Sequence, residues 1–167
     1  TKTEYGLVSG NDLCATLLPE GGVSVAEGTT NLIPLNRQKF EGWTAYDGAQ
    51  VTITQNISVP EWGTQKATRI QITGGTSQTK YFYTIKAPSE EGQDYSLSVK
   101  IKNIGLNPVR VFDNLGKSTV VDPGQIEYVK ITSIGNGTAN FLSSFRTEEV
   151  SHSLDFIVYQ PMAEEKP

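Results

Sequence analysis

The sequence predicts an all-β fold in which two antiparallel sheets pack face to face as a jelly-roll β-sandwich. Three observations support this fold class. Helical periodicity is almost absent, short runs of alternating apolar and polar residues recur, and 16 glycines and 8 prolines punctuate the chain. We count about nine to eleven candidate strands, more than one open sheet holds comfortably, so two packed sheets are expected.

The clearest strand is the run at 95–103. Its apolar and polar residues alternate strictly: Tyr95, Leu97, Val99 and Ile101 against Ser96, Ser98, Lys100 and Lys102. A period of two places each set on its own face of a strand. We expect the apolar set to face the core and the polar set to form either a solvated surface or the floor of a ligand site.

The remaining elements follow the same reasoning. Residues 1–30 are expected to form an irregular arm with one candidate strand at 23–26, residues 31–162 the β-sandwich, and residues 163–167 a solvated tail. Glycine, proline and asparagine clusters such as 122–124 and 135–137 mark the turns. The strands predicted in the sandwich are 51–54, 57–59, 68–72, 80–85, 94–103, 109–112, 119–121, 126–134, 139–146 and 153–159.

Composition excludes several classes of function. A net charge of −4 and a pI near 5.0 argue against nucleic acid as a partner. No run of 18 apolar residues is present, so we expect no membrane insertion. The single Cys14 cannot form an internal disulfide and is expected to be a buried, inert thiol. Because the chain opens at Thr1, we expect it to be a piece of a longer polypeptide, whose other domains are its partners.

No catalytic constellation is recognisable, and we expect the protein not to be an enzyme. The one histidine, His152, allows neither an HExxH motif nor a histidine-rich zinc site, and there is no G-x-S-x-G elbow or phosphate-binding loop. The adjacent carboxylates at 90–91 and 148–149 would point to opposite faces of a strand, so neither pair forms a glycosidase dyad by itself. A carboxylate pair contributed by two different strands is the alternative left open.

Several segments resemble, in the same order along the chain, the carbohydrate-binding modules of types 4 and 9. These segments are 31–34, 40–43, 67–70, 92–105 and 154–162. The resemblance covers residues 31–162 and implies a jelly-roll sandwich that binds sugars without cleaving them. The arm at 1–30 lies outside it.

A narrower likeness concerns the segments 27–33, 102–105, 121–124 and 159–167. They are similar to such modules in tail-associated proteins of phages that infect Gram-positive bacteria. This resemblance implies an extracellular or virion location, a bacterial polysaccharide or oligosaccharide as partner, and adhesion of the phage tail to host cell-wall polysaccharide. Two alternatives stay open: a substrate-targeting module of a secreted glycoside hydrolase, and a structural sandwich that binds no sugar.

Sugar sites combine aromatic rings with planar polar side chains on an exposed surface. Trp62, in a loop between Pro60 and Gly63, would either stack on a sugar or close the end of the sandwich, whereas Trp43 is expected in the core. Tyr81 and Tyr83 share one face of their strand and Phe82 the other, and only one of these faces can be core. The candidate carbohydrate-binding residues are Trp62, Tyr46, Arg69, Tyr81, Tyr83, Lys100, Arg110 and Arg146.

The charged candidates all lie opposite the apolar faces of their strands. If their strands belonged to one sheet, Arg69, Lys100, Arg110 and Arg146 would together line one polar surface able to bind hydroxyls or anionic groups. The alternative is a solvated sheet face.

The resemblance also implies a structural calcium ion. Asp155 matches the aspartate of the family's last strand, and Glu41 with backbone carbonyls near Asn31 would supply further ligands toward the roughly six to eight oxygens that calcium prefers. The alternative is an edge-strand aspartate that faces water.

Overall fold

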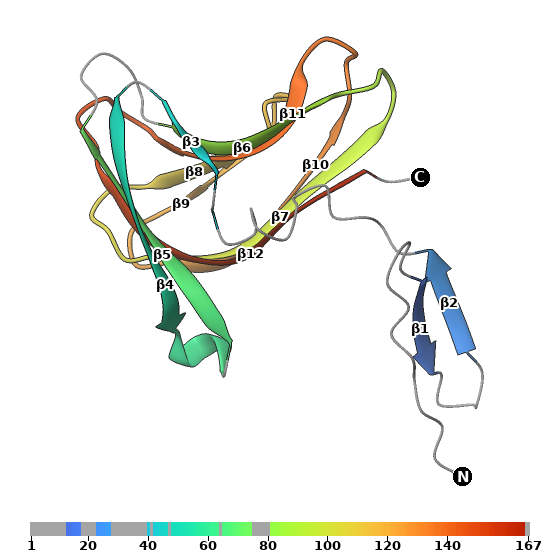
Figure 1. Ribbon diagram of the computed structural model, residues 1–167, viewed down its shortest axis with the longest axis horizontal. Helices are drawn as coiled ribbons and strands as arrows, with labels where there is room; N and C mark the ends of the chain where they lie inside the picture. Colours follow the sequence, from blue (N-terminus) through green and yellow to red (C-terminus); the bar gives the residue numbers. More distant parts are fainter. Residues whose placement is uncertain are drawn as a thin grey trace.

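The computed structural model describes residues 40, 42–46, 48–63, 65–74 and 81–165, and the backbone of 13–17 and 23–27. Within the described strands, the side chains at 81, 83–88, 142, 160 and 162–165 are not included. The structure is an antiparallel sandwich of two five-stranded sheets, which confirms the predicted fold class (Figure 1). None of the described helical segments has the length and apolar character that a membrane span requires.

The sheets are named here after a central strand of each. The β7 sheet has the order β10-β7-β12-β5-β4, and the β11 sheet has the order β3-β6-β11-β8-β9. The strands of the β7 sheet are β4 (Ala49–Ser58), β5 (Lys66–Gly74), β7 (Asp94–Asn103), β10 (Ile126–Ile134) and β12 (Leu154–Glu165). Those of the β11 sheet are β3 (Thr44–Ala45), β6 (Tyr81–Pro88), β8 (Val109–Phe112), β9 (Ser118–Val121) and β11 (Asn140–Thr147).

Two further strands form a separate two-stranded sheet. β1 (Leu13–Leu17) pairs antiparallel with β2 (Val23–Glu27). The candidate strand at 23–26 is therefore confirmed, while β1 was not predicted because its residues carry no strict alternation.

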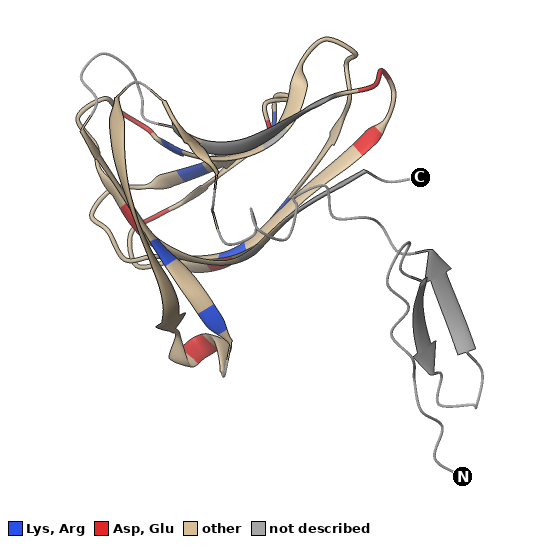
Figure 2. Ribbon diagram, in the orientation of Figure 1, with Lys and Arg blue, Asp and Glu red and all other residues tan. Residues whose placement is uncertain are grey.

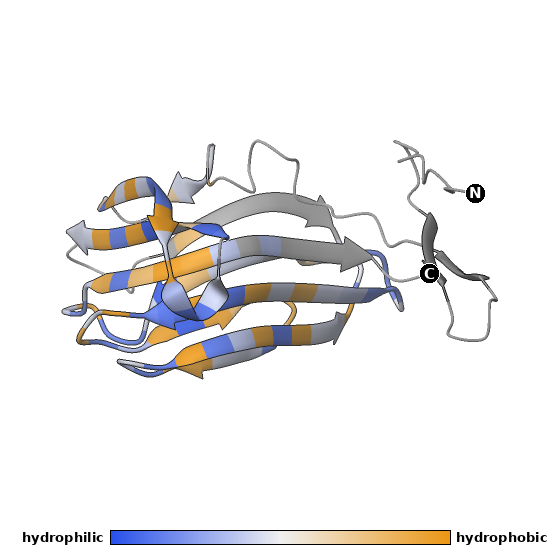
Figure 3. Cartoon of the chain, turned by 90° about the horizontal axis from the view of Figure 1, so that it is seen from below, coloured by the Kyte–Doolittle hydropathy of each residue, from blue (hydrophilic) through white to orange (hydrophobic). Residues whose placement is uncertain are grey.

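The alternation along β7 places its apolar set in the core, as predicted. Tyr95, Leu97, Val99 and Ile101 are at most 2% exposed, and alternating bands of hydrophobic and hydrophilic residues run along the strands (Figure 3). On the other face, Ser96 and Ser98 are also buried, whereas Lys100 and Lys102 are partly exposed. The serines therefore offer no exposed floor to a ligand.

An aromatic cluster fills the space between the sheets. The Trp43 ring lies 5.6 Å from Phe145 and 5.3 Å from Phe82, measured between centroids, and Trp43 is 8% exposed. Phe145 of the β11 sheet meets Phe156 of the β7 sheet at 4.8 Å. The prediction that Trp43 belongs to the core is confirmed.

Two strands run further than the sequence indicated, and each does so through a bulge. β4 joins the predicted runs 51–54 and 57–59, with a register shift between Thr54 and Ile57. β12 continues to Glu165, with a shift between Tyr159 and Met162. A bulge accommodates Pro161, which has no N–H for the ladder, so part of the expected tail pairs with β7.

A buried carboxylate holds the turn between β8 and β9. Asp113 is fully buried, and its Oδ1 accepts hydrogen bonds from the backbone N–H groups of Leu115 at 2.8 Å and Lys117 at 3.2 Å. Its Oδ2 accepts a hydrogen bond from the hydroxyl of Ser133 in β10. Asn114 adopts φ 65° and donates its side-chain amide to the carbonyl of Asn140 at 3.1 Å. The hairpin is thereby attached to both sheets.

We predict that Asp113→Ala lowers the free energy of unfolding by about 3 kcal/mol, on the order of 1 kcal/mol for each hydrogen bond that loses its acceptor. Denaturant unfolding measures the change. Ser133→Ala is the matched control, because it removes one of the three bonds and should cost about a third as much. Equal stability of Asp113→Ala and the wild type would contradict the anchoring role.

Candidate functional site

The candidate site lies on the outer face of the β11 sheet. Val109 and Val111 are fully buried, so Arg110 and Phe112, which alternate with them in β8, face outward. In β11 the buried Phe145 likewise leaves Arg146 on the outer face. The middle of this sheet curves toward the β7 sheet, so the outer face of the β11 sheet is concave in the view of Figure 1.

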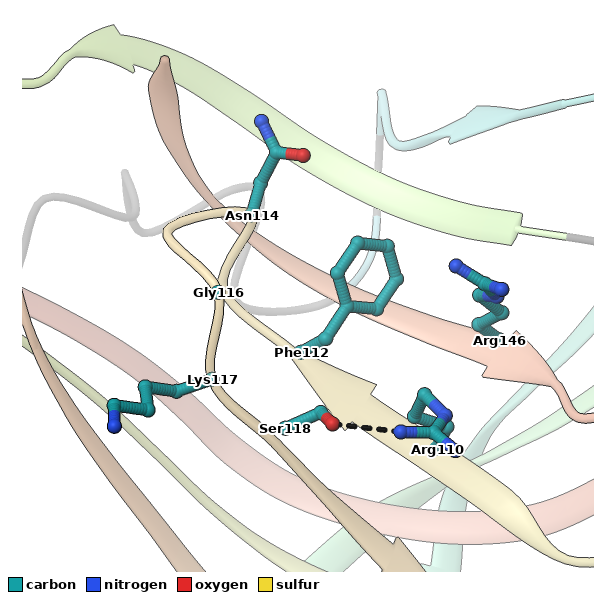
Figure 4. Close-up of a pocket in the computed structure, with 7 residues that line it drawn as sticks. All are labelled: Arg110, Phe112, Asn114, Gly116, Lys117, Ser118 and Arg146. Atoms are coloured by element: carbon teal, nitrogen blue, oxygen red, sulfur yellow. Dashed lines mark hydrogen bonds between the residues drawn. The ribbon is translucent and has the colours of Figure 1, made fainter. Parts of the chain in front are cut away.

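A pocket of about 380 Å³ opens on this face. Residues of β8 and β11 form its base, and the β8–β9 hairpin that Asp113 anchors forms one wall. Figure 4 shows the guanidinium groups of Arg110 and Arg146 beside the Phe112 ring. The lining residues are Arg110, Phe112, Asn114, Gly116, Lys117, Ser118 and Arg146.

Arg110 is fixed by a two-pronged ion pair. Its Nε donates to Oε1 of Glu148 and its Nη2 donates to Oε2, both at 2.6 Å, while Nη1 donates to the Ser118 hydroxyl at 2.7 Å. The hydrogen bonds from Arg110 lower the pKa of Glu148, against the opposing effect of partial burial, and the nearby charges of Arg110, Arg146 and His152 lower it further. Glu148 therefore stays ionised and holds Arg110 in one orientation.

Arg146 is positioned by an aromatic ring. Its Cζ lies 5.8 Å from the centroid of Phe112, a cation–π distance. The two arginines are direct partners in the register of β8 and β11. The pocket therefore holds two guanidinium groups and one ring from adjacent positions of two paired strands.

The expectation that four cationic candidates share one polar surface is wrong. Arg69 in β5 and Lys100 in β7 belong to the β7 sheet, while Arg110 and Arg146 belong to the β11 sheet, and the two sets lie on opposite outer faces of the sandwich. Figure 2 shows Lys and Arg residues distributed over both sheets. Alternation identifies the outward side of a strand, but it does not identify the sheet to which the strand belongs.

On the β7 sheet, Arg69 is engaged by Asp155. Arg69 Nε donates to Oδ1 at 2.8 Å and Nη2 donates to Oδ2 at 2.6 Å, and Gln71 adds a longer bond of 3.3 Å. Both oxygens of Asp155 therefore accept hydrogen bonds from the guanidinium group of Arg69, which is the geometry of a two-pronged ion pair.

The second proposed calcium ligand, Glu41, lies outside the described residues. Among the residues that are described, no three His, Cys, Asp or Glu side chains cluster as metal ligands do. The calcium site stays a prediction, and a rise in melting temperature with calcium that a chelator reverses would support it.

Trp62 lies in η2 (Pro60–Trp62), the 3-10 turn between β4 and β5, and packs on the outside of the β7 sheet. Its ring is 6.4 Å from that of Tyr159. It joins a small apolar cluster with Val59, Ala67 and Ile157, and an ion pair between Lys102 and Glu61 at 2.7 Å ties η2 to β7. Trp62 therefore neither closes the end of the sandwich nor lies near the pocket.

The tyrosine candidates belong to the β3–β6 side of the β11 sheet. Tyr46 is 42% exposed and follows β3 directly. Phe82 is buried, so the face of β6 that carries Phe82 is the one that faces the core. The backbones of Tyr81 and Tyr83 lie opposite those of Arg146 and Ser144. The side chains of Tyr81 and Tyr83 lie outside the described residues.

Several pocket residues were not among the candidates, namely Phe112, Asn114, Lys117, Ser118 and the supporting Glu148. The turn at 114–116 was recognised from the sequence. Phe112 lies two residues after Arg110, so the alternation of the strand could have placed it on the same outward face. What the sequence did not show was that Asp113 is buried and turns this hairpin into the wall of a pocket.

No protein-family model matches the chain, and no curated protein matches it. Solved structures do share its fold. The enzymatically active domain of tailspike protein 4 of bacteriophage CBA120 is 13% identical, with a TM-score of 0.54 over 81% of this chain and 21% of its own. A CBM4 structure is 14% identical, with a TM-score of 0.50 over 78% of this chain and 99% of its own.

An arabinose-bound GH51 α-L-arabinofuranosidase is 11% identical, with a TM-score of 0.51 over 75% of this chain and 23% of its own. The chain thus spans about a fifth of the two larger proteins and nearly all of the CBM4 structure. At these identities the likeness concerns the fold alone. The chain has the β-sandwich that carbohydrate-binding modules use.

The ion pair between Glu148 and Arg110 predicts that the free energy of unfolding depends on pH. Because the folded state depresses the pKa of Glu148, the ion pair stabilises the fold at neutral pH and is lost as pH falls through that lowered pKa, below the ordinary value of about 4.3. Glu148→Gln should therefore cost about 1 kcal/mol at pH 7 and nothing once Glu148 is protonated. Unfolding curves of the wild type and Glu148→Gln, recorded from neutral to acidic pH, measure this loss of stability. Glu149→Gln is the control, because Glu149 is exposed. A loss of stability in Glu148→Gln that does not change with pH would contradict the stabilising role of the ion pair.

Proposed function

We propose that this chain is a non-catalytic carbohydrate-binding module that holds a polysaccharide across the concave outer face of the β11 sheet. The observation that carries the proposal is the pocket, where two guanidinium groups flank an aromatic ring. Sugars stack their C–H faces on such rings and accept hydrogen bonds from such donors through their hydroxyl oxygens.

The pocket is organised before a ligand arrives. Glu148 orients Arg110, Phe112 supports Arg146, and Asp113 fixes the hairpin wall. Binding then orders few side chains of the protein, which limits the entropic cost of association.

The tyrosines of the β3–β6 side would extend this surface. Tyr81 pairs in register with Arg146 of the pocket and Tyr83 with the neighbouring Ser144, and Tyr46 is exposed at the edge of the same sheet. We assign them to a stacking platform that continues the binding face along the polysaccharide. Trp62, Arg69 and Lys100 lie on the opposite face and are left out of this site.

The parent polypeptide we favour is a phage tail or receptor-binding protein, and the ligand a bacterial cell-wall polysaccharide. The resemblance to modules of tail-associated proteins supports this, as does the shared fold with a phage tailspike domain; the resemblance is carried by the segments 27–33, 102–105, 121–124 and 159–167. The module would then act outside the cell or on the virion. The fold shared with an α-L-arabinofuranosidase supports the second parent, a secreted glycoside hydrolase that the module directs to its polymer.

We predict that Phe112→Ala weakens binding to the polysaccharide about tenfold, which corresponds to about 1.4 kcal/mol, because the ring that contacts the sugar is lost. The binding is measured on a glycan array and by co-sedimentation with purified bacterial cell walls. Tyr128→Ala is the matched control, since Tyr128 is an exposed aromatic residue of the β7 sheet.

Two results would contradict the proposal. If no glycan or cell wall binds the wild-type protein, the sandwich is structural and binds no sugar. If Phe112→Ala binds as tightly as the wild type while retaining its melting temperature, the binding face lies elsewhere on the molecule.

A further inference from the structure

β4 is an edge strand of the sandwich and borders the β7 sheet (Figure 1). Among the strands that the structure describes, it pairs only with β5. Residues 49–54 pair with 69–74 without interruption, and the bulge after Thr54 ends this regular segment. Every second residue of an edge strand points its N–H and C=O groups to the free side, so such a segment is able to pair with a further strand.

The other edges of the sandwich have features that oppose such pairing. β3 and β9 are only two and four residues long. β10 is longer, but Glu127 alternates with the buried Val129 and so places a charge on the inward side of the strand. Short edges and inward charges both protect a sheet from pairing with another chain.

β4 lacks these features over its regular segment. Its ten residues include no charged residue and no proline, and its bulge affects only the part after Thr54. The residues at 51–54 are all β-branched, which favours an extended strand. The segment 49–54 therefore has both the conformation and the neutral side chains that strand addition requires.

One apolar side chain of this segment is incompletely covered. Ile53 lies on the core-facing side of β4, opposite the buried Ile70 of β5, yet it is 37% exposed. β3, which contacts β4 from the other sheet, is too short to cover the length of β4. A strand added on the free side of β4 would cover part of the Ile53 side chain.

We infer that β4 pairs antiparallel with β4 of a second copy of this chain, which joins the two five-stranded β7 sheets into one. A second copy fits because the segment is uncharged, so no like charges oppose each other when it pairs with itself. Opposed residues share a face of the joined sheet, so Ile53 of each copy lies beside a core-facing residue of the other. The arrangement is isologous, as in most symmetric dimers.

The pairing also determines how the two copies face. Residues that pair across the dimer belong to the same alternate set of each strand and so lie on the same face of it. The two-fold axis is therefore perpendicular to the joined sheet, and the pockets of both copies open on one side of the dimer. This consequence rests on the proposed carbohydrate binding: two pockets on one side would raise the avidity for a polysaccharide surface.

Sedimentation equilibrium of the whole chain, from about 5 to 500 µM protein, tests the dimer. The weight-average mass should rise from 18.2 kDa toward twice that value as the concentration increases. Pairing over six residues gives a small interface, so we expect association mainly at the upper concentrations. A mass that stays at 18.2 kDa throughout overturns the inference.

A matched pair of variants locates the interface. Thr52→Lys places a lysine of each copy near the centre of the pairing, where like charges should weaken association about fivefold. Thr132→Lys, the same change at an exposed position of the β10 edge, should leave association unchanged. A mixture of Thr52→Lys and Thr52→Glu should associate more strongly than either variant alone, because opposite charges then meet.

The placement at β4 is overturned if Thr52→Lys associates as the wild type does, or if both lysine variants lose association equally. Melting temperatures establish that the variants are folded. The result is separable from that of the proposed function, because dimer formation is measured without a glycan. If the protein binds cell walls but remains a monomer, only the dimer is refuted; if it dimerises but binds no glycan, only the proposed function is refuted.

Discussion

The contact between Phe145 and Phe156, at 4.8 Å, joins the two sheets at the centre of the sandwich. The rest of the structure depends on this apolar interface. Burial of these rings together with Trp43, Phe40 and Phe82 determines which side of each strand faces inward, and hence which residues every strand presents to solvent. A shift of one residue in register would exchange the two sides along a whole strand. The positions of Arg110 and Arg146 on the outer surface therefore follow from the burial of Val109, Val111 and Phe145.

The two outer surfaces of the sandwich differ in how their polar groups are satisfied. On the β7 sheet, Arg69 is neutralised by Asp155, Lys102 bonds Glu61, and Trp62 packs into a small apolar cluster. On the β11 sheet, Glu148 binds Arg110, and Arg146 lies beside the Phe112 ring in the pocket. The pocket is the reason for proposing that the binding face lies on the β11 sheet.

Buried polar groups connect the fold to the proposed binding face. Asp113 has no exposed surface, yet it determines the conformation of the hairpin that carries Asn114 and Lys117. Its second oxygen bonds Ser133 in the opposite sheet, so the wall of the pocket is attached to the whole sandwich and not to one edge of it. A buried carboxylate of this kind is tolerated because its hydrogen bonds offset the cost of its desolvation.

The sequence by itself determined the all-β class, the core face of β7, the position of Trp43 and most strand locations, because a period of two is a local property of the chain. It also placed Arg110 and Arg146 outward. Only the tertiary structure decided that Arg69 and Lys100 face the other side of the molecule, that Asp155 holds Arg69, and that Phe112 and the hairpin at 113–117 complete a pocket. The reason is physical: alternation records the side of a strand that is buried, but the assignment of strands to sheets arises from pairing between residues far apart in the chain.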